Sequence, residues 1–485
     1  MTDHHNNVAA GMLAQAGILN AEAVEKAAAL LQQMAASDVE TVRILFADQH
    51  GVLRGKTIVA SALESVFASG LAAPNTLLLK DTAHKTVFPV WSADPGIAGG
   101  MSGAGDLLMV PDPDTFRILP WSPHSAWIFC DARYKSGGVI PYSPRDLLKT
   151  AITKLADNKL ALVVGLEVEF HVYRCENPML AHADATMPGT PVKTQNLSQG
   201  YQLLTEAHYA ALEPVMDNLR RHCQALGLPI RSMEIEMGPS QFEFTFDPSD
   251  PLTHADNMIM FRTMVKEVCA QQGLHATFMC KPNIENACAS GWHLHQSVTN
   301  IDTGKNLMIP DAPGALSNVA SGWIAGLLAH AEESCLLTTP TVNGYKRYQP
   351  QQLAPDRIQW GRDNRGAMVR ALMTPGDPAS RIENRVAETT ANPYYFFASQ
   401  ILSGLSGINE GLPLPNAVEA PYDSAACRLP ESLLSAIQHF HASDFYRQNC
   451  GDEFVEYLVQ IKRAEWDRYH RTVSEWEQAE YFGLY

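Results

Sequence analysis

The sequence lacks several features that would mark particular classes of protein. No apolar run approaches the roughly 18 residues that can cross a membrane. The nine cysteines include no Cys-x-x-Cys pair, which argues against a structural zinc site and predicts reduced thiols. The start, Met-Thr-Asp-His-His, has neither the basic nor the apolar region of a signal peptide. We therefore expect a cytoplasmic protein with no membrane partner.

Positive charge is also scarce. The chain has 36 lysines and arginines against 52 aspartates and glutamates, a net charge of −16. This balance argues against nucleic acid as a partner. With 485 residues, 46% of them hydrophobic, the chain is long enough for two or three domains with a large core.

The order of predicted elements indicates an α+β fold. An Ala/Leu-rich helix is expected over residues 20–36, capped by Asn20, followed by two strands around a turn at Gly51. Another helix is expected to begin at Ser143-Pro144. Beyond it, strands alternate with helical stretches, which are expected at residues 205–226, 252–273, 313–337 and 430–480. We place a domain boundary near residue 140, with domains at 1–139 and 140–485.

Acidic, histidine and arginine residues recur at alternating positions of four predicted strands. They are Glu167 and Glu169, Glu236 and Glu243, His293 and His295, and Arg381, Glu383 and Arg385. Positions i and i+2 of a strand face the same side, so each segment projects its polar residues together. Buried carboxylates need partners. Several converging strands of them predict bound cations, and the arginines predict an anion beside those cations.

Each of these motifs has an ordinary interpretation when taken alone. A Glu-x-Glu strand is more often a solvated face, and a histidine pair is more often a feature of the core or surface. Here Glu167 and Glu169 lie between Ala-Leu-Val-Val-Gly-Leu and Phe-His-Val-Tyr, which favours a buried strand. Carboxylates that outnumber histidines favour Mg²⁺ or Mn²⁺ over zinc.

Arginines gather between residues 347 and 385. They are Arg347, Arg365, Arg370, Arg381 and Arg385. A basic surface patch is the ordinary interpretation of such a group. Arginine beside divalent cations instead suits phosphate and carboxylate, because its fork donates two parallel hydrogen bonds. The segment Gly-Val-Leu-Arg-Gly-Lys-Thr at 51–57 is one residue short of a phosphate-binding loop and is interpreted as a turn. Metals and arginines without such a loop indicate phosphoryl transfer by electrostatic clamping.

Nearly the whole chain resembles the class I glutamine synthetases and their amine-ligating branch, which includes γ-glutamylanilide synthetases. The segments that carry the resemblance are Gly-Leu-Glu-Val-Glu-Phe, Ser-Gly-Trp-His-Leu-His-Gln-Ser, Asn-Gly-Tyr-Lys-Arg, Asp-Asn-Arg-Gly-Ala-Met-Val-Arg, Arg-Ile-Glu-Asn-Arg and Thr-Ala-Asn-Pro-Tyr. The resemblance implies a small N-terminal β-grasp-like domain and a large catalytic domain with an antiparallel half-barrel sheet and helices. It also implies a homo-oligomeric ring, a dodecamer, with active sites between neighbouring subunits.

The resemblance assigns roles to residues. It implies one metal held by Glu169, Glu236 and Glu243, and a second held by Glu167, His293 and Glu383. It implies contacts of Arg347, Arg385 and Ala289 with substrate glutamate, and of Arg365 and Arg370 with the transferred phosphoryl group, beside Glu383. It implies that His295, Ser297, Arg370 and Arg381 contact ATP. Tyr201 matches a tyrosine that borders the ammonium site.

The chain departs from the family pattern around the amine. The flap glutamate that helps to deprotonate ammonium is replaced by Leu353, and the family's ammonium-binding aspartate has only Asp81 as a counterpart. Trp292 stands where methionine is usual and is expected in the amine pocket. A carboxylate-poor pocket suits an amine that is neutral at pH 7, such as aniline, because no ammonium ion has to be captured and deprotonated.

The alternatives remain open at this stage. Leu353 could be a feature of one branch only, with Asp81 still receiving an ordinary amine. The product would then be a γ-glutamyl derivative of a polyamine, ethanolamine or alkylamine, or glutamine itself. A non-catalytic structural homologue is disfavoured because all six metal-ligand positions carry suitable residues.

Overall fold

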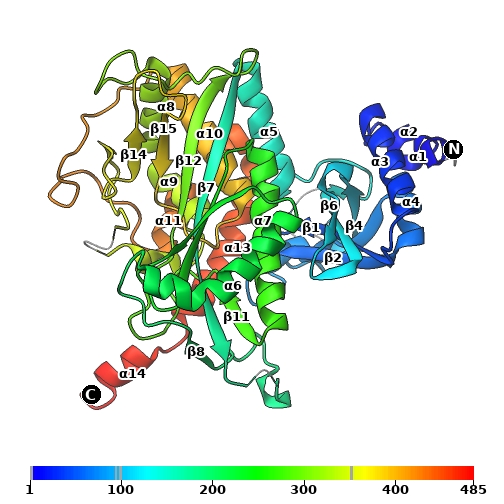
Figure 1. Cartoon of the computed structure of the whole chain (residues 1–485), viewed down its shortest axis with the longest axis horizontal. Coiled ribbons are helices and arrows are strands. Elements are labelled where there is room, and N and C mark those ends of the chain that lie inside the picture. The colour runs from blue at the N-terminus through cyan, green and yellow to red at the C-terminus, as the bar shows by residue number, and fades with distance from the viewer. Residues whose placement is uncertain (1–3, 93–95, 98–100, 178, 350–352) are drawn as a thin grey trace.

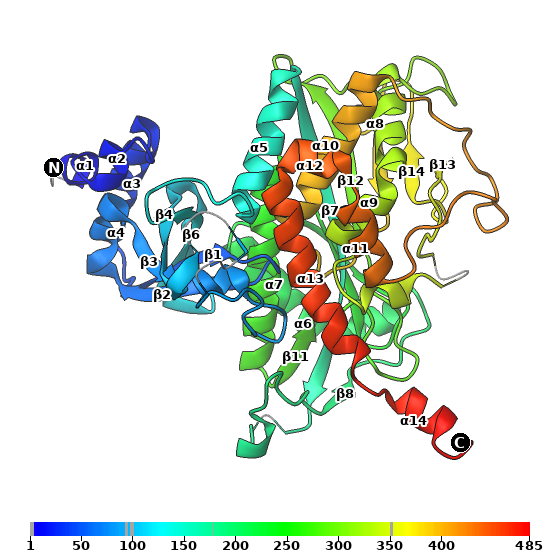
Figure 2. The same ribbon diagram turned by 180° about the vertical axis from the view of Figure 1, so that it is seen from behind.

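The computed structural model describes residues 4–92, 96–97, 101–177, 179–349 and 353–485. A smaller N-terminal unit lies at one side of a larger body, and the C-terminal helix α14 (Glu475–Tyr481) extends away from that body (Figures 1 and 2). The predicted α+β class is confirmed. Among the described residues, no helix is long and apolar enough to span a bilayer.

The N-terminal unit is built on a six-stranded sheet. Its strand order is β2-β1-β6-β4-β3, with β5 paired to β6, and the β1–β6 pair is parallel. The strands are β1 (Thr41–Ala47), β2 (Leu53–Val59), β3 (Leu71–Pro74), β4 (Asp106–Pro111), β5 (Arg117–Leu119) and β6 (Ser122–Tyr134). The helices are α1 (His4–Ala9), α2 (Met12–Gln15), α3 (Ala21–Met34) and α4 (Leu63–Ser69).

Two local predictions for this unit hold. Helix α3 begins as expected, because the Asn20 side chain accepts a hydrogen bond from the Ala23 amide at 2.8 Å. The turn between β1 and β2 contains Gly51 with a φ of 68°, in the left-handed region that favours glycine.

The larger body contains a nine-stranded sheet. Its strand order is β13-β14-β15-β12-β7-β10-β9, with β8 and β11 also paired to β7. All pairs are antiparallel except β13 with β14. The strands are β7 (Leu160–Cys175), β8 (Thr194–Asn196), β9 (Ile230–Ile235), β10 (Gln241–Phe246), β11 (Leu274–Thr277), β12 (Trp292–Asn300), β13 (Trp360–Arg362), β14 (Val369–Leu372) and β15 (Arg381–Asn384).

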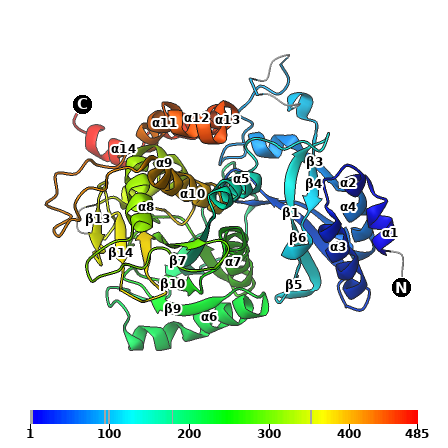
Figure 3. The same cartoon turned by 90° about the horizontal axis from the view of Figure 1, so that it is seen from above.

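Helices cover this sheet on its apolar side. Figure 2 shows α10 to α13 over the back of the sheet, and Figure 3 shows α6 beyond β9 on the other side. The helices are α5 (Pro144–Asp157), α6 (Glu206–Ala225), α7 (Pro251–Gln271), α8 (Asn318–Ala329), α9 (Ala331–Thr338), α10 (Pro393–Glu410), α11 (Leu433–His441), α12 (Asp444–Cys450) and α13 (Asp452–His470). The single helical stretch predicted at 313–337 is therefore two helices, which meet at His330.

Alternation along β7 positions the polar face. Leu166, Val168 and Phe170 are all at most 1% exposed and belong to the hydrophobic core. Glu167 and Glu169, between them, project to the opposite face. The core thus fixes the register of the strand, since a shift by one residue would move every carboxylate into the apolar layer.

A buried arginine joins the two units. Arg145, at the start of α5, donates to Asp131 of the N-terminal sheet at 2.9 Å and to the neighbouring Asp112 at 2.7 Å. Its Nη2 also donates to Asp256 of α7 at 2.9 Å. The side chain is 6% exposed, so its positive charge is neutralised by carboxylates from both units rather than by water.

Candidate active site

The polar positions of neighbouring strands meet on one face of the large sheet. Glu167 of β7 lies opposite His293 of β12 in the antiparallel register. Towards the other edge, Glu169 of β7 lies opposite Glu243 of β10. Strand β15, which carries Glu383, pairs with β12. The register therefore gathers side chains that alternation alone could only assign to one face of each strand.

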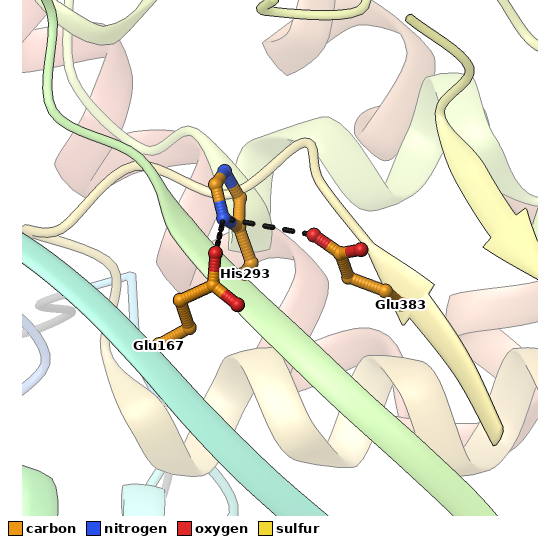
Figure 4. Close-up of side chains that lie close together, drawn as sticks. All are labelled: Glu167, His293 and Glu383. Carbon is orange, nitrogen blue, oxygen red and sulfur yellow. Dashed lines mark hydrogen bonds and ion pairs between the residues drawn. The ribbon is translucent and has the colours of Figure 1, made fainter. Parts of the chain in front are cut away.

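One group of possible metal ligands is Glu167, His293 and Glu383 (Figure 4). The Nδ1 atom of His293 lies 2.8 Å from Oε1 of Glu167 and 3.6 Å from Oε1 of Glu383. One donor atom from each of the three side chains lies within 4.8 Å of the others. Carboxylate oxygens with a single imidazole nitrogen fit Mg²⁺ or Mn²⁺.

The charge of Glu167 is balanced within the protein. Burial raises the pKa of this carboxyl, but the imidazoles of His293 and His295 outweigh burial and hold the pKa well below its usual range. The Nε2 atom of His295 lies 3.0 Å from Oε2 of Glu167. Both oxygens of Glu167 therefore have an imidazole neighbour.

Glu383 is balanced in the same way by arginines. Its carboxylate accepts a hydrogen bond from Arg385 and another, at 3.0 Å, from Nη1 of Arg370. Burial raises the pKa of Glu383, and His293 and Arg385 together reverse that effect and lower it. Glu383 is fully buried yet charged at neutral pH.

A second group of possible ligands, Glu169, Glu243 and His293, also has donor atoms within 4.8 Å of one another. Here burial and neighbouring carboxylates outweigh the opposing effect of Arg347 and Arg385 on the pKa of Glu169. Burial and the charge of Glu236 raise the pKa of Glu169 to about 8. Burial and the charges of Glu167 and Glu169 raise the pKa of Glu243 well above its usual value. This group of buried carboxylates fits a divalent metal ion, which favours oxygen ligands.

Glu236 stands at the edge of the second group. It follows the end of β9, is half-buried, and accepts the amide hydrogen of Met237 at 3.2 Å. Burial, with the charges of Glu234 and Glu167, raises the pKa of Glu236 to about 7. Glu236 is thus close enough to Glu169 to raise its pKa. The third member of the group with donor atoms within 4.8 Å is nevertheless His293 and not Glu236. The assignment of ligands to individual metals stays a prediction.

Arg347 is buried beside His293. Its Nη1 donates to the carbonyls of Arg385 at 2.9 Å and Val386 at 3.0 Å, and its Nη2 lies 3.4 Å from Nε2 of His293. A Cβ atom at Gly291 would lie 2.4 Å from Nη2 of Arg347, so this approach requires glycine. Backbone carbonyls thus hold a guanidinium next to the candidate metal ligands.

The predicted nucleotide contacts lie towards one end of β12 and β15. Nε of Arg381 donates to Nδ1 of His295 at 3.1 Å, and Ser297 donates to the Ser380 carbonyl at 3.0 Å. Arg381 also lines a cavity of about 360 Å³, together with Arg362 and Asp377. The wall of this cavity is polar and carries Asp363 and Asp377 beside the two guanidinium groups, which can donate to an anionic ligand.

The remaining predicted phosphoryl and glutamate contacts lie on loops. Arg365 is exposed in the turn between β13 and β14, and Ala289 is half-buried shortly before β12. Arg370 of β14 is held by Asp363 as well as by Glu383; its Nη2 donates to Asp363 at 2.6 Å. Their contacts with ligands stay predictions.

Two predicted amine-pocket residues are exposed. Tyr201 is 63% exposed with a φ of 61°, and its amide donates to the carbonyl of Met237, next to Glu236, at 2.7 Å. Leu353 is 51% exposed with a φ of 53°. The preceding residues of the flap segment, 350–352, lie outside the described residues.

Trp292 does not belong to the pocket, and this expectation is corrected. Its side chain is fully buried and packs edge-on against Phe396 and Phe397 of α10. Alternation explains the error: Trp292 directly precedes His293 in β12, so the two side chains lie on opposite faces of the sheet.

Asp81 is engaged within its own chain. One oxygen accepts the amides of Ala83 and Lys85 at 2.9 Å, and the other forms an ion pair with Arg468 of α13. The residue is 4% exposed. These contacts give Asp81 a structural role, and its place in an amine pocket stays a prediction.

Three buried polar residues were absent from the predicted site: Gln241, Ser290 and His171. Gln241 and His171 lie opposite each other on β10 and β7, two positions along from Glu243 and Glu169. Alternation placed both on the polar face, which is the signal that could have found them. Ser290 lies in the loop before β12, at the start of the Ser-Gly-Trp-His segment, where alternation along a strand does not apply.

Comparison with known proteins agrees with this geometry. Residues 141–481 match the family described as "Glutamine synthetase, catalytic domain". The chain is 38% identical over 475 residues to the γ-glutamylanilide synthase of Acinetobacter sp, covering 94% of this chain and 95% of that protein. It is 33% identical over 453 residues to γ-glutamylethanolamide synthetase GlnA4 of Streptomyces coelicolor, covering 92% and 93%. A solved structure of a GmaS/ADP complex superimposes with a TM-score of 0.78 at 26% identity, covering 94% of this chain and 99% of that one.

The chain therefore belongs to the glutamine synthetase family. The resemblance inferred from the motifs is confirmed, as is the two-part architecture it implied.

Proposed function

We propose that this ATP-dependent glutamate–amine ligase joins L-glutamate to an apolar, aromatic amine of the aniline type. The observation that carries the choice of amine is Leu353, an apolar side chain where the family's ammonium-using members have a carboxylate. The similarity to the γ-glutamylanilide synthase, which covers nearly all of both chains, supports the same choice.

The first step activates glutamate. Arg347 and Arg385 bind the substrate glutamate, while Arg365 and Arg370 bind the phosphoryl group in transit. An oxygen of the γ-carboxylate attacks the γ-phosphorus of ATP, the bond to ADP breaks, and γ-glutamyl phosphate forms. The cavity beside Arg381 supports placing the nucleotide at that end of the sheet.

Divalent cations would be held by the two carboxylate and histidine groups. When bound, they neutralise charge on the phosphates during transfer. The raised pKa values of Glu169 and Glu236 support this role, since they show that neighbouring cationic groups do not fully balance the buried carboxylates, and a bound cation would favour their ionised form.

The second step uses a neutral amine. The nitrogen lone pair attacks the acyl carbon of γ-glutamyl phosphate, phosphate leaves, and the nitrogen loses a proton. Aniline arrives with its lone pair free, whereas ammonium and alkylammonium ions must first lose a proton. Apolar side chains near Glu236 support an aromatic ring: Leu204 is 61% exposed and Met237 is 48% exposed. Burial of a ring contributes roughly 1.5–3 kcal/mol, or about ten- to a hundredfold in preference.

A protonated alkylamine or ethanolamine is the second candidate. Glu234 and Glu236 lie two residues apart at the end of β9, both half-buried, and could receive a cationic nitrogen. The similarity to a γ-glutamylethanolamide synthetase favours the same alternative. The active enzyme is proposed to be a homo-oligomeric ring.

The test measures phosphate release with ATP, Mg²⁺ and L-glutamate against aniline, isopropylamine, ethanolamine, putrescine and ammonia. We expect the highest kcat/KM with aniline. The value with ammonia should be lower by at least about tenfold. If ammonia or putrescine gives the highest value, the aromatic amine is wrong and only the ligase chemistry survives.

Leu353→Glu sharpens this test. The new carboxylate would face the ring without a partner, so kcat/KM for aniline should fall by about tenfold or more. Leu353→Met is the matched control and should keep most of the activity. A Leu353→Glu enzyme that uses aniline as well as the parent does would show that position 353 does not border the amine.

A further inference from the structure

We propose that Gln241 is a positioning residue for one of the two metal groups, because it fixes both Glu169 and the turn that carries Glu236. The inference rests on the proposed metal-dependent function. It adds a residue to which the motifs of the sequence assign no role.

The side chain of Gln241 bridges two parts of the site. Its Nε2 donates to Oε2 of Glu169 at 3.1 Å, and its Oε1 accepts the amide hydrogen of Gly238 at 2.9 Å. Gln241 is 1% exposed, so water does not compete for these bonds. Gly238 is required here, since a Cβ atom at that position would lie 2.6 Å from Oε1 of Gln241.

The backbone of Gln241 holds the same turn. Its carbonyl accepts the amide hydrogen of Glu236 at 3.1 Å, and its amide donates to the carbonyl of Gly238 at 3.2 Å. Gln241 therefore forms hydrogen bonds with the turn that follows Glu236 through both its main chain and its side chain. A methionine side chain would remove the side-chain bonds to Gly238 and Glu169 and leave the two main-chain bonds in place.

A buried relay orients the amide of Gln241. Its Nε2 also donates to Oγ of Ser290 at 3.1 Å, and Ser290 lies 3.3 Å from Nδ1 of His171. Ser290 and His171 are both 0% exposed. Because Oε1 is committed to Gly238 and Nε2 to two acceptors, the amide has only one satisfied orientation.

The consequence for Glu169 is that its two oxygens have different surroundings. Oε2 accepts from Gln241 and from the amide of Gly291, at 3.1 and 3.0 Å. The other oxygen, Oε1, lies 3.9 Å from Nε2 of His293, on the side of the candidate ligand group. Gln241 thus directs Glu169 to offer a single oxygen to a cation.

The test titrates metal-free protein with Mn²⁺, without ATP, glutamate or amine, and resolves the sites by calorimetry and by electron paramagnetic resonance. Gln241→Met removes donor and acceptor, and Gln241→Glu keeps the shape but removes the donor. We expect each to weaken one Mn²⁺ site by about tenfold or more, as for other residues that orient metal ligands, and to leave the second site within about twofold.

Gln359→Met is the matched control, because Gln359 is also buried and donates to the Pro421 carbonyl. It should leave both sites unchanged. Two Mn²⁺ sites of parental affinity in Gln241→Glu would overturn the proposal, and so would equal weakening of both sites, which indicates a general loss of structure. If the parent protein itself binds no Mn²⁺, the metal-dependent function fails and not the role of Gln241 alone.

Discussion

The two halves of the candidate site treat buried carboxylates in opposite ways. Around Glu167 and Glu383, imidazole and guanidinium groups of the protein balance the charge and lower both pKa values. Around Glu169 and Glu243, burial and neighbouring carboxylates outweigh the cationic groups nearby, and both pKa values are raised. The same strand, β7, supplies one carboxylate to each half. The difference indicates that the first half is organised before ligands bind, whereas the second is completed by a cation.

His293 belongs to both halves, so its replacement should have the largest effect. We expect His293→Ala to lower Mg²⁺-dependent turnover by at least about a hundredfold, because even partners of metal ligands affect affinity by ten- to a hundredfold. The steady-state rate of phosphate release measures this loss. His330→Ala, which removes an imidazole that contacts Glu333 and Ser406 instead, is the control. Near-normal turnover in His293→Ala would contradict the proposal that His293 serves both halves of the site.

Amide substitutions in the two halves should separate them by stability. Glu383→Gln leaves Arg370 and Arg385 without their carboxylate, and we expect it to destabilise the metal-free protein by about 3 kcal/mol or more. Glu243→Gln resembles the protonated acid that its raised pKa favours, so it should leave stability unchanged or slightly higher. Thermal unfolding at pH 8 without metal compares them. Equal destabilisation by both changes would contradict the proposed difference in charge balance between the two halves.

The smallest expected effect is a pH dependence to which the carboxylate-rich half contributes. The folded-state pKa values of Glu169 and Glu236, about 8 and about 7, lie above the usual 4.5. Protonation therefore favours the folded metal-free protein, and this stability is lost as pH rises through those values. Between pH 9 and pH 7 we expect a gain of roughly 1–2 kcal/mol.

Melting temperatures in chelator and in saturating Mg²⁺ test this dependence. Bound Mg²⁺ keeps the carboxylates ionised, so the melting temperature should depend less on pH in Mg²⁺ than in chelator. In chelator, Glu169→Gln should likewise reduce the dependence of the melting temperature on pH. A metal-free protein that becomes more stable from pH 7 to pH 9 would contradict the sign.

Alternation along single strands predicted the faces of the site but not its grouping. It placed Glu167 and Glu169 on one face of β7, and their division between two groups came from the family resemblance; the pairing of β7 with β12 and β10 gives the physical reason. Register between strands distant in sequence depends on the packed core, which no local pattern encodes. The same alternation excluded Trp292 from the pocket, and comparison by position with the family led to the wrong assignment.

Residues outside the strands were hardest to place. Arg347 lies on a short helical turn, where its guanidinium is fixed by carbonyls whose positions the sequence does not reveal. Asp81 matched a family position, but its ion pair with Arg468, hundreds of residues away, could not be read from either segment. Tertiary contacts of this kind decide whether a carboxylate is available to a ligand.

Arg145 has a consequence for how the protein unfolds. Its charge is shared among Asp112 and Asp131 of the N-terminal unit and Asp256 of the larger one. Unfolding of either unit would break some of these ion pairs and leave buried charges in the other unit without a partner. Unfolding of one unit should therefore destabilise the other. The boundary predicted near residue 140 is therefore not expected to separate two independently unfolding parts, and the two units should melt in a single transition.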